Sequence, residues 1–154
     1  MRGFTLVEIV ITLGVLTALL TLTGVSLLSS RQHTSLNSAA AEITADLKGQ
    51  QAKAMVGDTA GSGAVSPYGI YFSAGSYTLF KGSVYSPADP DNFEVSLEPS
   101  QTFSSPGLTV VFNSGSGEIV GFIPGGYIFT LADSLEGISK TFNLNRYGVI
   151  TSIN

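Results

Sequence analysis

The stretch that decides the fold is the first one, MRGFTLVEIVITLGVLTALLTLTGVSLL, residues 1–28. From Phe4 to Leu28 it carries one ionisable side chain, Glu8, among apolar residues, Thr, Ser and Gly. At about 1.5 Å per residue its 25 positions would form a helix of roughly 37 Å, enough to cross a hydrocarbon core of about 30 Å. The sequence therefore predicts a transmembrane helix over residues 4–28 of a single-pass membrane protein.

A secretory signal peptide is the alternative interpretation of this stretch. Such a peptide has an apolar region of about 7–15 residues, followed by a small-residue cleavage site. Here the apolar run is too long, and the carboxylate of Glu8 stands close to its start. A charge inside a membrane segment costs on the order of 2.5–3.5 kcal/mol, so it usually has a partner. The other explanation for Glu8 is that it lies near the cytoplasmic end and reaches the lipid headgroups.

The residues Gly3-Phe4-Thr5-Leu6-Val7-Glu8 resemble the processing motif of type IV prepilins and pseudopilins. The resemblance implies that a prepilin peptidase cuts between Gly3 and Phe4 and N-methylates Phe4, so that residues 1–3 are a leader peptide. Family leaders usually carry more basic residues than the single Arg2 found here. A carboxylate one helical turn from the new ammonium group would compensate its charge at low dielectric. We therefore expect Glu8 to pair with the Phe4 amine of a neighbouring subunit and to set subunit register.

The composition excludes several classes of function. The net charge is −4, and the seven basic residues are scattered, so no basic footprint indicates nucleic acid as a partner. The chain has no cysteine, which removes disulfides, thiolate metal sites and cysteine nucleophiles. His33 is the one histidine, and no catalytic cluster surrounds it in the sequence. We expect no enzyme and no cofactor, and a membrane-tethered enzyme remains a disfavoured alternative.

Helical periodicity continues after the apolar stretch. Apolar residues recur at steps of three and four, with one double step, at Leu36, Ala40, Ile43, Leu47 and Ala54. The spacing predicts that residues 29–56 form the amphipathic second half of one long helix, which ends at Gly57-Asp58. We expect the apolar stripe to pack on a β-sheet.

Residues 57–154 are predicted to form a globular β domain. Alternating or β-branched runs bounded by turn formers predict these strands: 68–72, 77–81, 93–97, 108–112, 118–122, 127–131, 138–144 and 147–151. The pairs 68–72 with 77–81, 108–112 with 118–122, and 138–144 with 147–151 are predicted hairpins. The fold class is therefore α+β, with a long N-terminal helix whose first half is transmembrane, packed on a C-terminal antiparallel β-sheet domain, as in pilins.

Residues 41–54, 111–115, 129–131 and 147–149 are similar to H-type pseudopilins and FimT/FimU-like minor pilins. This resemblance implies a structural subunit of a type IV pilus or type II secretion pseudopilus, placed near the filament tip. It also implies that, before assembly, the chain is a single-pass protein of the inner (cytoplasmic) membrane with an extracytoplasmic C-terminal domain. Its implied partners are the prepilin peptidase, other pilin or pseudopilin subunits, the inner-membrane assembly platform, and membrane lipid before assembly. Some FimT-like proteins that take up DNA carry clustered C-terminal arginines, whereas this chain has Lys140 and Arg146.

Two ligand hypotheses concern the β domain. Asp89 and Asp91, followed by Asn92, are oxygen ligands of the kind calcium prefers. The EF-hand spacing is missing, and Asp-Pro-Asp-Asn is ordinary turn chemistry, so a plain loop is the favoured interpretation. The alternative function is an adhesin or DNA-uptake pilus subunit whose β domain binds a ligand.

Overall fold

The computed structural model describes residues 5–59, 61, 63–135 and 137–153, and of these the side chains of all except 21–34, 152 and 153. The chain divides into two compact units, residues 1–35 and 36–154, called here the N-terminal and C-terminal units. Helix α1 (Leu6–Val56) contributes to both, so its parts are described separately. Gly3 and Phe4, the predicted cleavage residues, lie outside the described residues.

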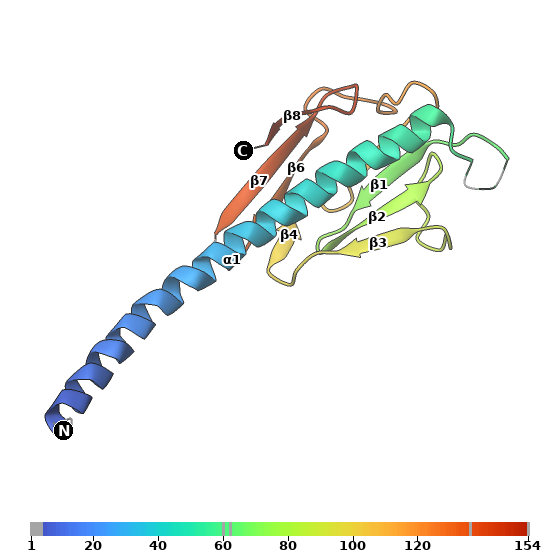
Figure 1. Ribbon diagram of the computed structural model, residues 1–154. Helices are drawn as coiled ribbons and strands as arrows, with labels where there is room; N and C mark the ends of the chain where they lie inside the picture. Colours follow the sequence, from blue (N-terminus) through green and yellow to red (C-terminus); the bar gives the residue numbers. More distant parts are fainter. Residues whose placement is uncertain (1–4, 60, 62, 136, 154) are drawn as a thin grey trace. The chain divides into compact units, whose positions relative to one another are not determined.

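In the C-terminal unit, α1 packs through the predicted apolar stripe. Its five apolar members are at most 4% exposed and belong to the core cluster: Leu36, Ala40, Ile43, Leu47 and Ala54. In Figure 1 this part of α1 lies in front of the strands of the unit, with β7 on one side of it and β1 on the other. The prediction that residues 36–54 bury one face against a sheet is confirmed.

The eight strands form two antiparallel sheets of four. Sheet A has the order β3-β2-β1-β5 and sheet B the order β4-β6-β7-β8. The strands of sheet A are β1 (Tyr68–Phe72), β2 (Ser76–Lys81), β3 (Phe93–Ser96) and β5 (Thr109–Phe112). Those of sheet B are β4 (Gln101–Phe103), β6 (Ile128–Asp133), β7 (Ile138–Leu144) and β8 (Ile150–Ile153). The predicted first and last strand pairs are confirmed, since β1 pairs with β2 and β7 with β8.

An aromatic cluster joins the two sheets beneath α1. Phe72 of sheet A lies 5.0 Å from Phe103 and 4.4 Å from Phe129 of sheet B, measured between ring centroids. Phe129 in turn stacks on Phe142 at 4.8 Å. The chain crosses from sheet A to sheet B between β3 and β4, where the Phe103 N–H donates to the Ala74 carbonyl in the β1–β2 turn. Side-chain contact and backbone bonding therefore hold the sheets in one core.

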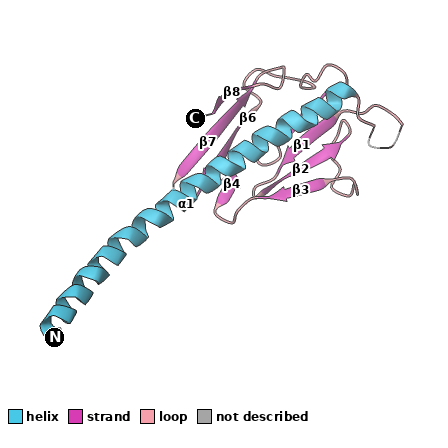
Figure 2. Ribbon diagram, in the orientation of Figure 1, coloured by secondary structure: helices cyan, strands magenta, loops and turns pink. Residues whose placement is uncertain are grey.

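The predicted hairpin of 108–112 with 118–122 forms only in part. The two segments meet antiparallel at one bridge, Phe112 with Ile119, and no strand is present in the described residues between β5 and β6; Figure 2 shows the strands and loops of the unit. The N–H groups of Val120 and Asn113 donate across this bridge to the carbonyls of Val111 and Glu118, whereas the Ile119 N–H donates to the carbonyl of Arg146 in the β7–β8 turn. This segment thus connects sheet A to that turn. The strand β4 was not predicted.

The predicted fold class and membrane topology also need correction. Within the described residues, no helix is both long enough and apolar enough to span a bilayer. The β region consists of two sheets, and the one helix α1 belongs to two compact units. The predicted transmembrane first half of the helix, and a single-pass inner-membrane protein with an extracytoplasmic domain, are therefore contradicted.

Candidate functional site

The first candidate is the start of α1 in the N-terminal unit. The Glu8 N–H donates to Thr5 Oγ1 at 3.3 Å, and the N–H groups of Glu8 and Ile9 donate to the Thr5 carbonyl at 3.1 and 3.3 Å. Thr5 is therefore the N-cap of α1, and Glu8 is the third helical residue, where a capping box places an acidic side chain. The first helical residue, Leu6, is thus the third residue after the predicted cut. The Thr-x-x-Glu spacing was a signal for this cap, and the sequence interpretation missed it.

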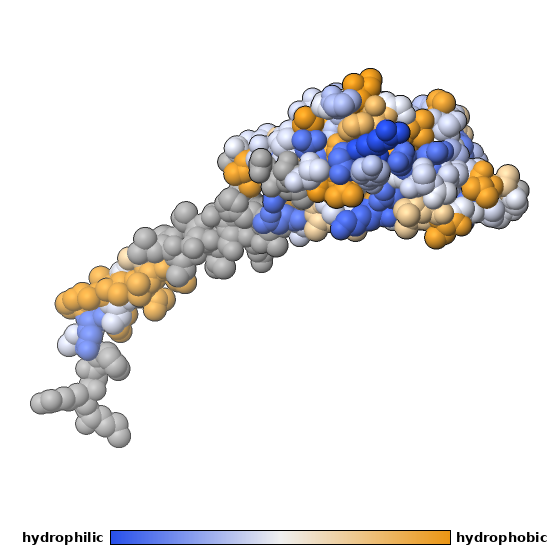
Figure 3. Space-filling model, turned by 90° about the horizontal axis from the view of Figure 1, so that it is seen from above, coloured by the Kyte–Doolittle hydropathy of each residue, from blue (hydrophilic) through white to orange (hydrophobic). Residues whose placement is uncertain are grey.

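The segment that follows, residues 6–20, is apolar on every side and exposed; it is called the apolar segment below. Its large side chains have exposed fractions of 49–78%: Leu6, Val7, Ile9, Val10, Ile11, Leu13, Val15, Leu16, Leu19 and Leu20. At 3.6 residues per turn these positions surround the helix axis, so they form no single stripe. Figure 3 shows apolar side chains over most of the visible face of this segment. Such a helix needs apolar neighbours on several sides.

The polar groups of the apolar segment divide into two kinds. The Thr12 hydroxyl lies 2.9 Å from the carbonyls of Glu8 and Ile9, and the Thr17 hydroxyl donates to the Leu13 carbonyl at 2.7 Å. These hydroxyls are satisfied within the helix, so they add little cost when the segment is covered. The carboxylate of Glu8 is exposed and is the charged group of this stretch. Covering the segment therefore requires a partner for one negative charge near its start.

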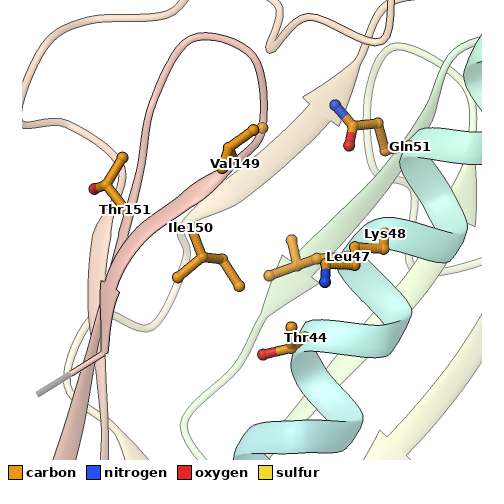
Figure 4. Close-up of a pocket in the computed structure, with 8 residues that line it drawn as sticks. Thr44, Leu47, Lys48, Gln51, Val149, Ile150 and Thr151 are labelled. Atoms are coloured by element: carbon orange, nitrogen blue, oxygen red, sulfur yellow. The ribbon is translucent and has the colours of Figure 1, made fainter.

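A pocket of about 400 Å³ lies in the C-terminal unit between α1 and β8 (Figure 4). Leu47, Val149 and Ile150 supply apolar walls. Gln51 closes one end, since its Nε2 donates to the carbonyls of Tyr147 at 2.6 Å and Gly117 at 2.8 Å. Lys48 is the ionisable side chain in the described lining. The described lining also includes the hydroxyls of Thr44 and Thr151 but no acidic side chain, and its apolar walls are contacts between helix and strand.

The predicted calcium candidates lie in a tight turn before β3. The Asp91 N–H donates to Asp89 Oδ1 at 3.0 Å, and Asn92 Nδ2 donates to the Ser86 carbonyl at 2.7 Å. Asp89 thus acts as a turn-forming side chain. Among the residues that the structure describes, no three His, Cys, Asp or Glu side chains gather in a way that could hold a metal ion. The side chain of His33 lies outside the described ones.

Two polar residues of α1, the half-buried Asp46 and the buried Gln50, have contacts that were not predicted. Tyr77 of β2 donates its hydroxyl to Asp46 Oδ2 at 2.6 Å. Gln50 is 3% exposed, and its Oε1 has no hydrogen-bond partner within the described part of the chain. A signal for Gln50 existed, because position 50 divides the double step from Leu47 to Ala54 into steps of three and four. The predicted stripe does not include Gln50, because glutamine is polar and the stripe consists of apolar residues.

No family model, curated protein or solved structure matches this chain.

Proposed function

We propose that this chain is a structural subunit of a filament of the type IV pilin class, a minor pilin or pseudopilin located near the filament tip. A prepilin peptidase removes residues 1–3, and the apolar segment then packs among the equivalent helices of neighbouring subunits. Other pilin subunits and the assembly platform are its partners. The proposal rests on the motif from Gly3 to Glu8 together with the geometry of the helix that begins there.

The observation that carries the proposal is the apolar segment itself. Ten large apolar side chains on all sides of residues 6–20 are about half exposed or more. Burying apolar area stabilises an assembly by about 25 cal/mol per Å², so several neighbouring helices around this segment provide a strong driving force. A contact on one side would leave the other faces exposed. A filament core, where each helix has neighbours all round, meets this requirement.

The carboxylate of Glu8 must find an opposite charge in such a core. The apolar surroundings of a packed segment make an uncompensated carboxylate costly, since breaking a buried ion pair costs about 3–5 kcal/mol. The ammonium group produced by cleavage before Phe4 provides the opposite charge. Pairing with a neighbour's terminus would fix the axial position of each subunit relative to the next.

The test is Glu8→Gln, with incorporation into filaments as the measurement. Glutamine is also accepted at the third position of a capping box, so the helix start is kept while the charge is removed. We expect normal cleavage and a loss of incorporation of about tenfold or more, which corresponds to about 1.4 kcal/mol or more. Glu42→Gln, an exposed glutamate of the C-terminal unit, is the matched control and should assemble normally. Equal incorporation of both variants would contradict the role of Glu8.

A further inference from the structure

A second pocket of the C-terminal unit has a lining unlike that of the first. It has a volume of about 330 Å³ and lies where α1, the hairpin β1–β2 and the turn before β3 meet. Its polar wall includes Gln50, Lys53, Asp58, Tyr68 and Asp91, and the aromatic side chain of Phe93 lines it as well. The volume falls within the range of small-molecule sites, about 300–1,000 Å³. On the order of ten water molecules would fill it, so a single bound water does not account for it.

Gln50 is the unusual member of this lining. It is 3% exposed and stands on the buried stripe of α1, yet its Oε1 has no hydrogen-bond partner in the described part of the chain. Buried polar atoms are normally paired, because leaving one unpaired destabilises the fold. The last torsion of glutamine is broad, so a rotation of the amide can present its oxygen to a ligand. A donor group in the pocket would supply the missing bond.

The charges around the pocket balance. Its lining includes two cations, Lys53 and Lys81, and two carboxylates, Asp58 and Asp91. Tyr68 donates its hydroxyl to the Asp58 carbonyl at 3.0 Å, and Lys53 Nζ lies 5.8 Å from the centroid of the Tyr68 ring. Burial, Asp58 and Asp91 all raise the pKa of Tyr68, so the phenol remains protonated at neutral pH. Such a lining supplies both donors and acceptors without favouring a charged ligand.

Phe93 adds an apolar platform. It begins β3, the edge strand of sheet A, and its side chain is 64% exposed. A large aromatic side chain left this exposed beside hydrogen-bonding groups is suited to a ligand with one apolar face and several hydroxyl groups. The C–H face of a sugar ring stacks on an aromatic ring, while its hydroxyl groups both donate and accept hydrogen bonds.

We propose that this pocket binds one neutral sugar unit, with Phe93 under the ring and the amide oxygen of Gln50 accepting a hydrogen bond from a sugar hydroxyl. The proposal is independent of the proposed function, because it concerns the C-terminal unit and does not depend on cleavage or assembly. It gives the chain a recognition activity in addition to a structural one.

The test uses the full chain in a sugar-free zwitterionic detergent that covers the apolar segment. Three probes of one shape and different charge are titrated: methyl glucoside, glucuronate and glucosamine. Methyl galactoside and N-acetylglucosamine extend the neutral set. Saturation-transfer NMR and amide shift changes around residues 50–58 and 91–93 report binding. We expect a neutral sugar to bind at this site at least threefold more tightly than either charged probe. Tighter binding of glucuronate or glucosamine would overturn the proposal. So would the absence of binding by every neutral sugar at concentrations up to 20-fold above the millimolar dissociation constants that are usual for single sugars.

Two variants connect binding to the residues named. Phe93→Ala should abolish the sugar signal, whereas Leu135→Ala, an exposed apolar residue away from the described lining, should leave it unchanged. Gln50→Leu removes a buried amide whose oxygen is unpaired, so it should raise Tm by about 4 °C per kcal/mol gained while it weakens binding at least fivefold. A Gln50→Leu protein with higher Tm and unchanged binding would show that the amide is a packing defect and would overturn its role as a ligand contact.

Discussion

The side-chain bond from Tyr77 to Asp46 connects β2 to α1 within the core. Tyr77 is 1% exposed, and its hydroxyl lies 2.6 Å from Asp46 Oδ2. Hydrogen bonds to charged groups contribute about 1.5–3 kcal/mol, roughly twice the value for neutral pairs. The ring also packs in the aromatic cluster, 6.2 Å from Phe72 and 6.4 Å from Phe103. One residue thus fixes the helix against sheet A and contributes to the contact with sheet B.

Tyr77→Phe should lower the free energy of unfolding by about 1.5–3 kcal/mol, because it deletes the bond and leaves Asp46 facing an apolar ring. Urea denaturation at pH 7 measures this. Tyr147→Phe is the matched control, since Tyr147 is 62% exposed, and it should change stability by less than about 0.5 kcal/mol. If Tyr77→Phe lowered the free energy of unfolding no more than Tyr147→Phe does, the hydrogen bond to Asp46 would contribute nothing to stability.

The same residue predicts how stability depends on alkaline pH. Burial, followed by the bond to Asp46, raises the pKa of Tyr77 above its usual value of about 10. Above pH 10 the unfolded chain loses this phenolic proton and the folded chain keeps it, so the unfolded state binds fewer protons. Stability should then fall by up to about 1.4 kcal/mol per pH unit from this group, whereas its contribution is complete below pH 10. The stability difference between wild type and Tyr77→Phe should therefore be constant up to pH 9 and shrink above pH 10; a constant difference up to pH 11.5 would contradict the raised pKa.

Among the elements, the β7–β8 turn depends on close contact with α1. Gly148 has φ +69°, and a Cβ there would lie 2.6 Å from Phe112 Cε1 and 2.8 Å from Gln51 Nε2. Gln51 is the residue that bonds the carbonyls of Tyr147 and Gly117. The turn, the helix and β5 therefore meet at a point where a side chain has no room.

Gly148→Ala should destabilise the fold by about 2–4 kcal/mol, combining the cost of a left-handed conformation with that of overpacking. Gly137→Ala is the matched control, because Gly137 has φ +65° but nothing lies within 4 Å of its added Cβ among the described residues. We expect the control to cost about 1–2 kcal/mol, from the backbone conformation alone. Chemical denaturation of both variants measures the difference. If both variants lost the same free energy of unfolding, the close approach of Gln51 and Phe112 to Gly148 would add nothing to the cost of the substitution.

The elements that were predicted correctly are those with local causes. The stripe from Leu36 to Ala54 follows from the period of the helix, and the hairpin from Tyr68 to Lys81 follows from alternation around a short turn. The elements that were not predicted depend on partners that are distant in the sequence. Strand β4 is three residues long and is fixed by Phe103, whose ring meets Phe72 and whose N–H bonds Ala74. Pattern reasoning has no access to such partners.

The same distinction applies to the candidate sites. The capping spacing from Thr5 to Glu8 can be predicted from the sequence, and so can the apolar run after it. The position of Gln50 on the stripe can also be predicted. That its amide oxygen is unpaired cannot be predicted, because this depends on which groups β1, β2 and the turn before β3 bring near it.

For the whole molecule, the division into two units makes a strong prediction. All residues of the buried core cluster lie between Leu36 and Leu144, within the C-terminal unit. The N-terminal unit contributes the apolar segment, whose large side chains are exposed. The chain therefore carries its core and its proposed assembly surface on different parts.

A chain shortened to residues 32–154 should fold cooperatively and stay monomeric, because it keeps the core and lacks the apolar segment. Circular dichroism during thermal unfolding and sedimentation velocity measure the two properties. The full chain without detergent should sediment as large species under the same conditions, since an exposed apolar surface of this extent drives association. Self-association of the shortened chain to the same degree would place the assembly surface elsewhere.

The most direct test of the account is the intact mass and N-terminal fragmentation of the chain, purified from cells that contain an active prepilin peptidase. Gly3→Leu, which changes the residue before the proposed cut, serves as the uncleaved reference. If the chain is a filament subunit whose helix starts at its processed terminus, it begins at an N-methylated Phe4, and the Gly3→Leu chain keeps Met1. If the unaltered chain also begins at Met1 while the same peptidase cuts a known substrate, Glu8 has no ammonium group to pair with and the proposed assembly mechanism is contradicted.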